Sequence, residues 1–317
     1  MKAITLLALA VLPALGLYPG CNAITGVDPP QHLGSGGATS GSASGGAGGA
    51  GPTSPSLAAA SHLQLWLTAD KGFDCDTATG RVKAWRDQSG HGRDTSTVYG
   101  QLPPRCQTHT LNGIDVPFFD APASKNGEFV DGTLDVDLGF LQGTEHTIFV
   151  VERRWADRTA KMDACRILGT TQADETLTCA SKAAFHSALQ VGYVYYDGFP
   201  AVGMDFTCLG CGARIAPVPI VPPAPAAIDM SRFAVISGSE FWVNGIEIGW
   251  TRADTGLAAA SGGALGRAQY VFKSETRYIG DLAEVVIFDA ALSWADQAAM
   301  EAYLEAHWAQ PFAVPPP

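Results

Sequence analysis

The chain has 317 residues, of which 46% are hydrophobic and only 16% charged, and its formal net charge is −11. An acidic chain without a dense run of Lys and Arg argues against nucleic-acid binding and against docking on an anionic lipid surface. Gly (36) and Pro (20) are frequent, which favours many short strands joined by tight turns over a helical bundle.

Residues 1–21 have the features of an export signal of the lipoprotein type. A positive residue is followed by an apolar segment, 4–17, that has signal-peptide length and is too short to span a bilayer. The sequence LYPGC at 17–21 resembles the bacterial lipobox, with Tyr18 where Leu is usual, so Cys21 is the expected lipidation site. We therefore expect an exported protein that contacts a membrane only through its N-terminal lipid, at the outer membrane or cell surface. Without the lipid it would be periplasmic or secreted.

The cysteine count fits this compartment. Seven cysteines are present, and setting Cys21 aside leaves six. An even set in an exported protein predicts disulfide bonds, although six cysteines allow many connectivities. Pairing of sequence neighbours gives Cys75–Cys106, Cys165–Cys179 and Cys208–Cys211. The last pair also has the spacing of zinc ligands, but no second C-x-x-C accompanies it, so a disulfide is favoured.

Residues 22–57 are predicted to be a disordered linker. The segment 33–55 consists almost entirely of Gly, Ser, Ala and Thr. Such a composition buries too little apolar surface to offset the entropy of ordering the chain. As a flexible coil, this segment would reach roughly 25 to 30 Å, enough to hold a domain clear of a membrane.

Residues 58–312 carry the pattern of an all-β domain. Alternating apolar residues, or runs rich in β-branched and aromatic residues, predict strands at 63–67, 81–85, 146–151, 189–195 and 285–288. Asn244-Gly245 lies between two further β-like runs and predicts a type I′ hairpin. The proline-rich segment 217–225 lacks the amide donors of a sheet interior and is expected to be a loop.

One helix is predicted at the end of this domain. Ser293 is a plausible N-cap, and Asp296 follows at the spacing of a capping box. An apolar stripe at helical spacing is then expected to pack on the sheet, formed by Met300, Tyr303, Leu304 and Trp308.

Three stretches together resemble the laminin-G-like, or concanavalin A-like, domains of bacterial surface proteins. They are Leu65-Trp66-Leu67 with the W-x-D-x-S-G-x-G turn at 85–92, the Trp242-Val243-Asn244-Gly245 hairpin, and the closing strand and helix at 279–304. The resemblance implies a two-sheet antiparallel jelly-roll sandwich with one C-terminal helix. Such domains often bind carbohydrate or protein, sometimes with calcium. The cysteine-rich segment 165–225 departs from the pattern, which predicts loop insertions there.

The turn at 85–92 is expected to be structural. Asp87 and Ser89 have short side chains that can accept backbone N–H groups and fix the turn, while Trp85 fills the core. His91 is interpreted as a turn residue.

Aromatic side chains beside polar groups are the candidates for sugar binding, because sugars stack on flat rings. The densest such group is Tyr193, Tyr195, Tyr196 and Asp197, and Trp155 is a second candidate. Core or cross-strand packing is the more common role of such residues.

The arrangement of carboxylates distinguishes a sugar-binding domain from a sugar-cleaving enzyme, since a glycosidase needs two carboxyl groups on either side of the scissile bond. The E-x-D-x-E strand pattern of concanavalin A-like glucanases is absent. Asp135 and Asp137 share a strand face, with Asp131 nearby, but no evident proton donor accompanies them. A solvated strand face is favoured for these three residues, and calcium ligation is the alternative. The resemblance to the family's closing strand implies that Glu284 forms hydrogen bonds within the fold rather than taking part in chemistry.

These features together favour a non-catalytic binding or adhesion module of the cell envelope, with carbohydrate or an extracellular protein as its ligand. No catalytic residue is assigned, and calcium is the one cofactor considered. The alternatives are a glycoside hydrolase or polysaccharide lyase on the same fold, and a purely structural envelope lipoprotein.

Overall fold

The computed structural model describes residues 57–97, 102–120, 132–142, 145–154, 164–170, 189–196, 199–206, 229–235, 239–243, 246–251, 262–268 and 276–308. The chain divides into two compact units, Met1–Gly46 and Ala47–Pro317, and all described residues belong to the second. The predicted export signal, Cys21 and nearly all of the linker therefore lie outside the described residues. None of the helices in these ranges has the length and apolar character of a membrane span.

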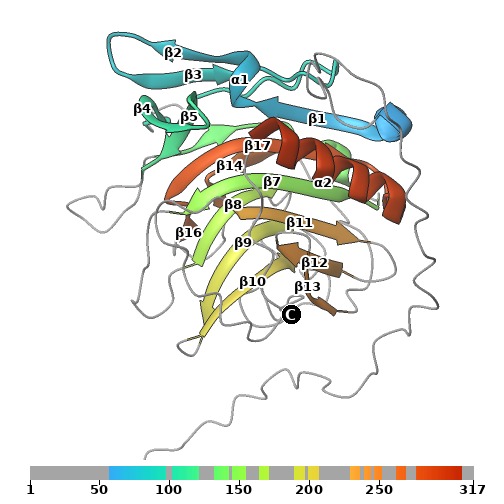
Figure 1. Ribbon diagram of the computed structural model, residues 1–317. Coiled ribbons are helices and arrows are strands. Elements are labelled where there is room, and N and C mark those ends of the chain that lie inside the picture. Colours follow the sequence, from blue (N-terminus) through green and yellow to red (C-terminus); the bar gives the residue numbers. More distant parts are fainter. Residues whose placement is uncertain are drawn as a thin grey trace, which may run out of the picture. The chain divides into compact units, whose positions relative to one another are not determined.

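Two antiparallel sheets contain most of the described strands (Figure 1). The larger sheet has ten strands in the order β13-β12-β11-β7-β17-β5-β4-β3-β2, and β1 also pairs with β17. The smaller sheet has five strands in the order β10-β9-β8-β14-β6, and β15 pairs separately with β16. The larger sheet is visibly curled (Figure 1).

The elements have the following bounds. The larger sheet consists of β1 (Leu63–Thr68), β2 (Phe73–Asp76), β3 (Arg81–Trp85), β4 (Arg105–Leu111), β5 (Ile114–Phe119), β7 (Thr147–Arg154), β11 (Asp229–Val235), β12 (Ser239–Val243), β13 (Ile246–Thr251) and β17 (Gly280–Phe288). The smaller sheet consists of β6 (Leu134–Asp135), β8 (Ala164–Thr170), β9 (Leu189–Tyr196), β10 (Phe199–Phe206) and β14 (Gly263–Leu265). The short pair is β15 (Arg267–Ala268) with β16 (Thr276–Arg277). The described helices are α1 (Ala69–Gly72), α2 (Trp294–Trp308) and the 3-10 segments Leu57–His62 and Gly139–Leu141.

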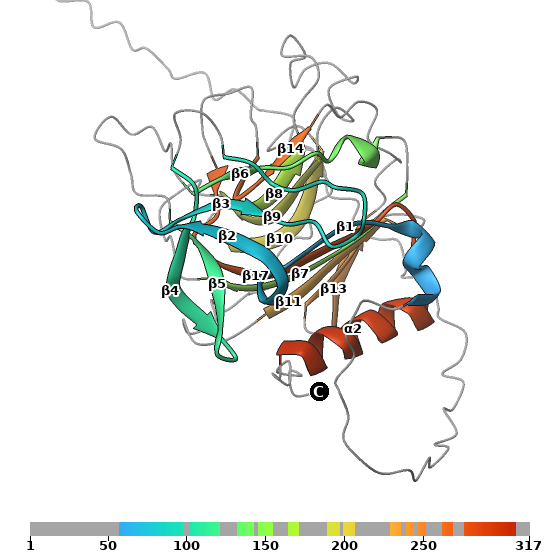
Figure 2. The same cartoon turned by 90° about the horizontal axis from the view of Figure 1, so that it is seen from above.

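Strand β17 is the centre of the larger sheet. One edge pairs along its length with β7, while the other pairs with β5 at Gly280 and Asp281 and with β1 from Glu284 to Phe288. Every residue of β17 is buried, as expected for a strand covered on both faces. Figure 2 shows α2 on one side of the larger sheet and the smaller sheet on the other. Buried residues of both sheets and of α2 belong to one apolar core.

The five strands predicted from their apolar pattern are confirmed, as β1, β3, β7, β9 and β17. The hairpin is also confirmed, because β12 and β13 pair antiparallel with Val243 opposite Ile246, although the turn 244–245 lies outside the described residues. A second Asn-Gly hairpin was not predicted. It joins β4 to β5 through Asn112 and Gly113, whose φ angles of 48° and 75° fit a type I′ turn.

Helix α2 begins and packs as the sequence predicts. The Ser293 hydroxyl accepts the Asp296 N–H at 3.2 Å and donates to the Asp296 carboxylate at 2.6 Å. The predicted apolar stripe is buried: Met300, Tyr303, Leu304 and Trp308. These four residues belong to the same apolar core as the two sheets, and Figure 2 shows α2 beside the larger sheet, so α2 is an integral part of the domain.

One of the three predicted disulfides lies within the described residues. Cys75 of β2 and Cys106 of β4 are bonded to each other, which confirms that pairing. Cys165 lies in β8, whereas Cys179, Cys208 and Cys211 lie outside the described residues together with the proline-rich segment 217–225. The other two pairings therefore stay predictions.

The fold class is confirmed at the level of a mostly β domain of antiparallel strands with a C-terminal helix. The assignment to a laminin-G-like jelly roll is more specific than these strand pairings establish. It stays a prediction.

Candidate functional site

Trp66 of β1 is held at two points by carboxylates that lie far apart in the sequence. Its backbone N–H donates to Asp87 Oδ1 at 3.0 Å, and its indole N–H donates to Glu284 Oε1 at 2.6 Å. Asp87 belongs to the turn that follows β3, and Glu284 belongs to β17. Trp66 thus connects the W-x-D-x-S-G-x-G turn to the buried junction between the larger sheet and α2.

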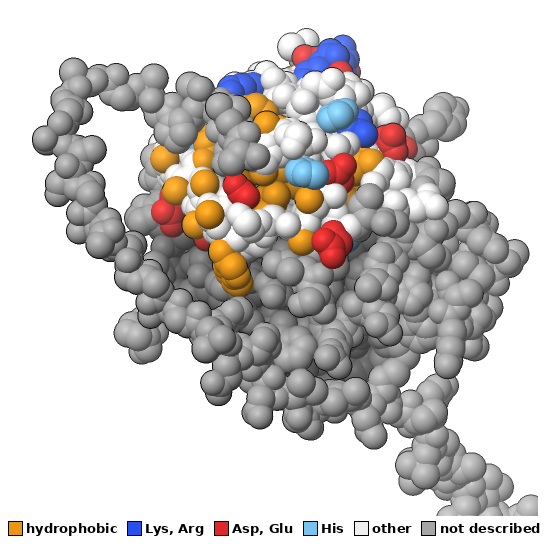
Figure 3. All heavy atoms as spheres, turned by 90° about the vertical axis from the view of Figure 1, so that its right-hand side faces the viewer, with side chains coloured by type: hydrophobic (Ala, Val, Ile, Leu, Met, Phe, Trp, Pro, Cys, Tyr) orange, Lys and Arg blue, Asp and Glu red, His pale blue; other side chains and the backbone are white. Residues whose placement is uncertain are grey.

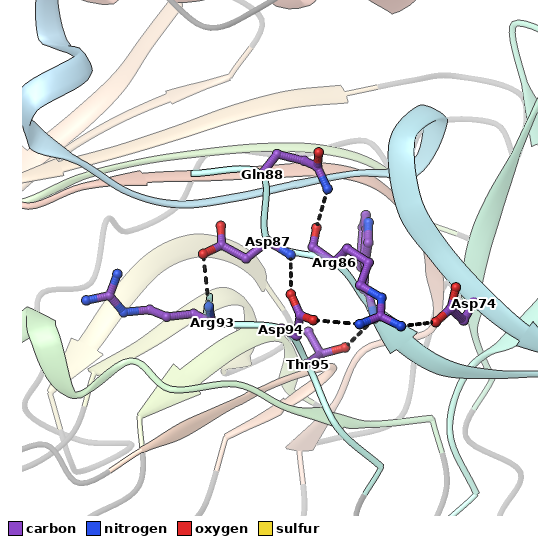
Figure 4. Close-up of polar contacts among 8 residues, drawn as sticks. Asp74, Arg86, Asp87, Gln88, Arg93, Asp94 and Thr95 are labelled. Atoms are coloured by element: carbon purple, nitrogen blue, oxygen red, sulfur yellow. Dashed lines mark hydrogen bonds and ion pairs between the residues drawn. The ribbon is translucent and has the colours of Figure 1, made fainter. Parts of the chain in front are cut away.

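The turn is organised around the Asp87 carboxylate (Figure 4). Besides Trp66, Asp87 accepts the backbone N–H of Ser89 at 2.9 Å, the Ser89 hydroxyl at 2.7 Å and the backbone N–H of Arg93 at 3.0 Å. Burial opposes ionisation of Asp87, but the backbone N–H groups of Ser89, Trp66 and Arg93 outweigh it and hold its pKa below the usual value. Trp85 is fully buried. The structural interpretation of this turn is therefore confirmed.

An ion-pair network flanks the turn. The Arg86 guanidinium donates to Asp94 Oδ2 at 2.9 Å and to Asp74 Oδ2 at 2.5 Å, and Asp94 Oδ1 accepts the backbone N–H of Asp87 (Figure 4). These hydrogen bonds raise the pKa of Arg86, Asp74 contributing most. The acidic groups around this turn are thus matched by an arginine. No group of three or more His, Cys, Asp or Glu suited to a metal ion is found in the described ranges.

The Glu284 carboxylate lies wholly inside the protein. Trp66 and the Tyr303 hydroxyl donate to Oε1 at 2.6 and 3.1 Å, and the Trp308 indole N–H donates to Oε2 at 2.8 Å. Burial raises the pKa of Glu284 to about 7, although all three hydrogen bonds favour the ionised form, and the charge of Asp70 adds to the rise. Burial also raises the pKa of Tyr303, so this hydroxyl keeps its proton.

Charged residues of α1 and α2 surround this carboxylate. His307 Nε2 lies 3.3 Å from Asp70 Oδ2, and the Thr68 hydroxyl donates to Asp70 Oδ1 at 2.6 Å. The Lys71 ammonium lies 4.6 Å from the centroid of the Trp66 ring. The His307 ring stacks on Tyr303 with 5.4 Å between centroids. Helix α2 is therefore joined to the sheet by hydrogen bonds to Glu284 and contacts α1 at Asp70.

A carboxyl group with a raised pKa is a candidate general acid. Glu284 has that property, but its side chain has no exposed surface, and both residues of α2 that bind it are buried as well. A substrate cannot contact this carboxyl while α2 is docked. The geometry instead supports hydrogen bonding within the fold, as the sequence predicts.

A second buried carboxylate lies further along the same face of the sheet. On the neighbouring strand β7, Arg153 lies opposite Asp281 and Val151 lies opposite Glu284. Residues 151 and 153 share a face of β7, so the two carboxylates opposite them also share a face. Asp281 accepts from Arg153 Nε at 2.7 Å and lies 2.6 Å from His109 Nδ1. An irregularity between Leu282 and Glu284 thus turns both carboxylates toward one side.

The sequence-predicted ligand residues are only partly described. Tyr193, Tyr195 and Tyr196 lie in β9, with Tyr193 opposite Val202 and Tyr195 opposite Pro200 of β10. Asp197 and Trp155 lie outside the described residues. The sugar-binding interpretation therefore stays a prediction.

Two of the three predicted calcium ligands lie within the described residues. Asp131 lies outside the described residues. Asp135 and Asp137 alternate with the buried residues Leu134, Val136 and Leu138, which confirms that the two aspartates share a face. Asp135 pairs with Arg267 at 3.2 Å, and Asp137 accepts the backbone N–H of Gly139 at 2.9 Å. Calcium ligation stays a prediction.

Sequence reasoning missed the convergence of Trp66, Tyr303 and Trp308 on Glu284, and the pairing of Asp281 with Arg153 and His109. The signal for the first was the apolar stripe of α2, two of whose members carry an N–H or O–H group that requires a partner when buried. Figure 3 shows described apolar, acidic, basic and histidine side chains interspersed on one face of the protein. The described residues on this face form no continuous basic surface.

No family model matches the chain, and no curated protein matches it. Among solved structures, domain 4 of a GH43 extracellular arabinanase from Geobacillus stearothermophilus, in complex with arabinotriose, has a TM-score of 0.47 and 10% identity, covering 76% of this chain and 98% of that one. Trypanosoma rangeli sialidase has a TM-score of 0.48 and 12% identity, covering 86% of this chain and 36% of that one. The binding domain of Paraclostridial Mosquitocidal Protein 1 has a TM-score of 0.46 and 12% identity, covering 77% of this chain and 52% of that one. Similarity of this degree assigns neither a family nor a ligand to the chain.

Proposed function

We propose that this chain is a non-catalytic binding or adhesion module of the bacterial cell envelope, with a laminin-G-like jelly-roll domain that binds carbohydrate or an extracellular protein. The lipobox-like sequence ending at Cys21 and the Gly-rich linker support an exported, lipid-anchored protein whose domain is displayed on a tether. The acidic net charge of −11 fits a soluble displayed domain and disfavours nucleic acid as a partner.

The proposal that the domain is non-catalytic rests on the burial and hydrogen bonding of Glu284. The pKa of this carboxyl is raised toward neutrality, as a general acid requires. Its two oxygens accept three donors from the fold and it has no exposed surface. Because the Glu284 carboxyl is buried and hydrogen-bonded between α2 and the larger sheet, it supports a structural role for this residue.

The ligand site is proposed on the aromatic strand β9. Tyr193, Tyr195 and Tyr196 lie near the edge of the smaller sheet, one strand in from β10. In the sequence these tyrosines adjoin Asp197, and aromatic residues beside polar groups suit the stacking and hydrogen bonding of a sugar. Calcium bound near Asp135 and Asp137 is proposed as an aid to binding, because carboxylate oxygens are its preferred ligands.

Glycan-array binding combined with a reducing-sugar release assay tests this function. We expect binding of at least one glycan class without sugar release, and loss of that binding in Tyr195→Ala but not in the matched surface variant Glu305→Gln of α2. Binding that falls with EDTA would support the calcium ligands. Release of reducing sugar that disappears in Glu284→Gln while the fold survives would show that the protein is a hydrolase.

The anchor is tested separately. Radiolabelled palmitate should enter the wild-type protein, and Cys21→Ala should move the chain to the soluble fraction. A wild-type chain that takes up no label would contradict lipidation without affecting the proposed ligand.

A further inference from the structure

The Glu284 carboxyl is a buried ionisable group whose hydrogen-bonding partners are all uncharged. They come from two elements: Trp66 from β1, and Tyr303 and Trp308 from the second half of α2. In the described part of the chain, no Lys, Arg or His side chain donates to this carboxyl. When the group is ionised, its charge is therefore balanced by three dipoles alone, in a place that water does not reach.

The same three partners also fit the protonated acid. Trp66 and Trp308 have indole N–H groups that only donate, whereas the Tyr303 hydroxyl can donate or accept. A proton on Oε1 can be donated to the Tyr303 oxygen, while the remaining lone pairs on Oε1 and Oε2 still accept both indole N–H groups. The junction can thus hold either protonation state in one arrangement. It has the properties of a binding site for a single proton.

The charged groups that face Glu284 lie in α1 and α2. Asp70 carries the same sign as ionised Glu284, His307 Nε2 lies 3.3 Å from Asp70 Oδ2, and the Lys71 ammonium lies over the Trp66 ring. A negative charge on Glu284 is therefore opposed by Asp70. That repulsion is relieved when Glu284 is neutral.

Among the described residues on this face of the sheet, a second buried carboxylate is already matched. Asp281 lies further along β17 and is held by Arg153 and His109. Val151 is opposite Glu284 on β7 and brings no charge. The described titratable groups nearest to Glu284 are thus those of α1 and α2, together with Asp281 and its partners Arg153 and His109.

We propose that this junction is a proton-linked latch, which holds helix α2 on the larger sheet when Glu284 carries a proton and loosens the C-terminal turns of α2 when that proton is lost to solvent. Loosening is confined to α2 because Trp66 stays fixed by β1–β17 pairing and by Asp87, whereas Tyr303 and Trp308 lie on a helix that no backbone pairing joins to the sheet. Acidic conditions therefore close the latch.

Hydrogen–deuterium exchange of the full chain tests the latch. After correction for the intrinsic exchange rate, we expect protection of the amides of α2 to fall about tenfold or more between pH 5.5 and pH 8.5, with little change in β7 and β17. In Glu284→Gln, a neutral side chain of the same shape, protection of α2 should not depend on pH through this range. The surface variant Glu305→Gln should behave like the wild type.

A spectroscopic measurement on the wild-type chain tests the latch if Glu284→Gln fails to fold. Infrared spectroscopy of the wild-type chain should show the carbonyl band of a buried protonated carboxylic acid that disappears near neutral pH. Constant protection of α2 across the range, an equal loss in β7 and β17, or the absence of such a band would each overturn the proposal.

Discussion

The indole N–H of Trp66 lies 2.6 Å from Oε1 of Glu284, although 218 positions separate the two residues in the chain. This hydrogen bond joins the first strand of the domain to the last. Because Glu284 also binds Tyr303 and Trp308, it connects three elements at one buried point: β1, β17 and α2.

Trp66→Phe isolates the first of these hydrogen bonds, because it keeps an aromatic ring and removes the N–H donor. We expect a loss of about 1.5 to 3 kcal/mol in unfolding free energy, typical of a hydrogen bond to a charged group, with the larger loss at alkaline pH. Urea denaturation at pH 8 measures it. Trp294→Phe is the matched control, since Trp294 is 47% exposed, and an equal loss in both variants would contradict the role of Glu284.

The stability of the protein should depend on pH through Glu284. Its pKa rises from 4.5 in the unfolded chain to about 7 in the fold, so the folded state binds the proton more tightly. The contribution of this group is fully present below pH 4.5 and is lost as the pH rises through about 7. At about 1.4 kcal/mol for each pH unit between the two values, the loss is on the order of 3 kcal/mol.

The wild-type free energy of unfolding, measured from pH 5 to pH 8, should therefore decline more steeply than that of Glu284→Gln. Parallel curves for the two proteins would exclude Glu284 as the titrating group.

Asp87 accepts four hydrogen bonds, three from backbone N–H groups, and its removal should disorder the turn. We expect Asp87→Ala to cost about 2 to 4 kcal/mol, because buried donors then lack a partner. Asp137→Ala removes a carboxylate with one such contact and should cost less than about 1 kcal/mol. Thermal melting compares the two, and similar losses would show that Asp87 does not organise the turn.

The disulfide between Cys75 and Cys106 closes a loop with a sequence separation of 31. Restricting the unfolded chain in this way stabilises the fold by about 3 to 4 kcal/mol. The double variant Cys75→Ser with Cys106→Ser should lose stability of that order. Peptide mapping without reductant should find the two cysteines linked in the wild type, and two free thiols at these positions would refute the bond.

Leu304 tests the docking of α2 through packing alone, because its side chain is buried and carries no polar group. Leu304→Ala should cost roughly 2 to 5 kcal/mol, the range for a tightly packed core leucine. Glu305→Ala, at the adjacent exposed position, should change the melting temperature little. A stable Leu304→Ala protein would mean that α2 is not part of the cooperative unit.

The strands and the helix could be predicted because their signals are local. Alternation at 63–67, the run at 285–288 and the cap at Ser293 each depend on residues within a few positions. The β4–β5 hairpin carried the same Asn-Gly signal as the predicted one, at Asn112 and Gly113, and was overlooked because β4 alternates weakly. In β4 only Cys106 and Leu111 are buried, so the strand does not alternate regularly between buried and exposed positions.

The junction around Glu284 could not be predicted in the same way. Strand β17 lies beside β1 in the sheet, and this pairing brings together Trp66, Glu284 and Trp308. The order of strands in a sheet cannot be predicted from a local sequence pattern. The irregularity between Leu282 and Glu284 also decides which face Asp281 takes, and a regular strand would place the two carboxylates on opposite faces. The resemblance gave Glu284 a hydrogen-bonding role but not its partners.

The position of β17 has a consequence for how the domain folds. This strand joins β1, β5 and β7, each of which precedes it in the sequence by more than a hundred positions. In the described part of the chain, β1 has no partner strand and β7 has one of its two until β17 has joined the sheet. Because pairing of segments so far apart in the sequence is slow, the larger sheet is expected to be completed late in folding.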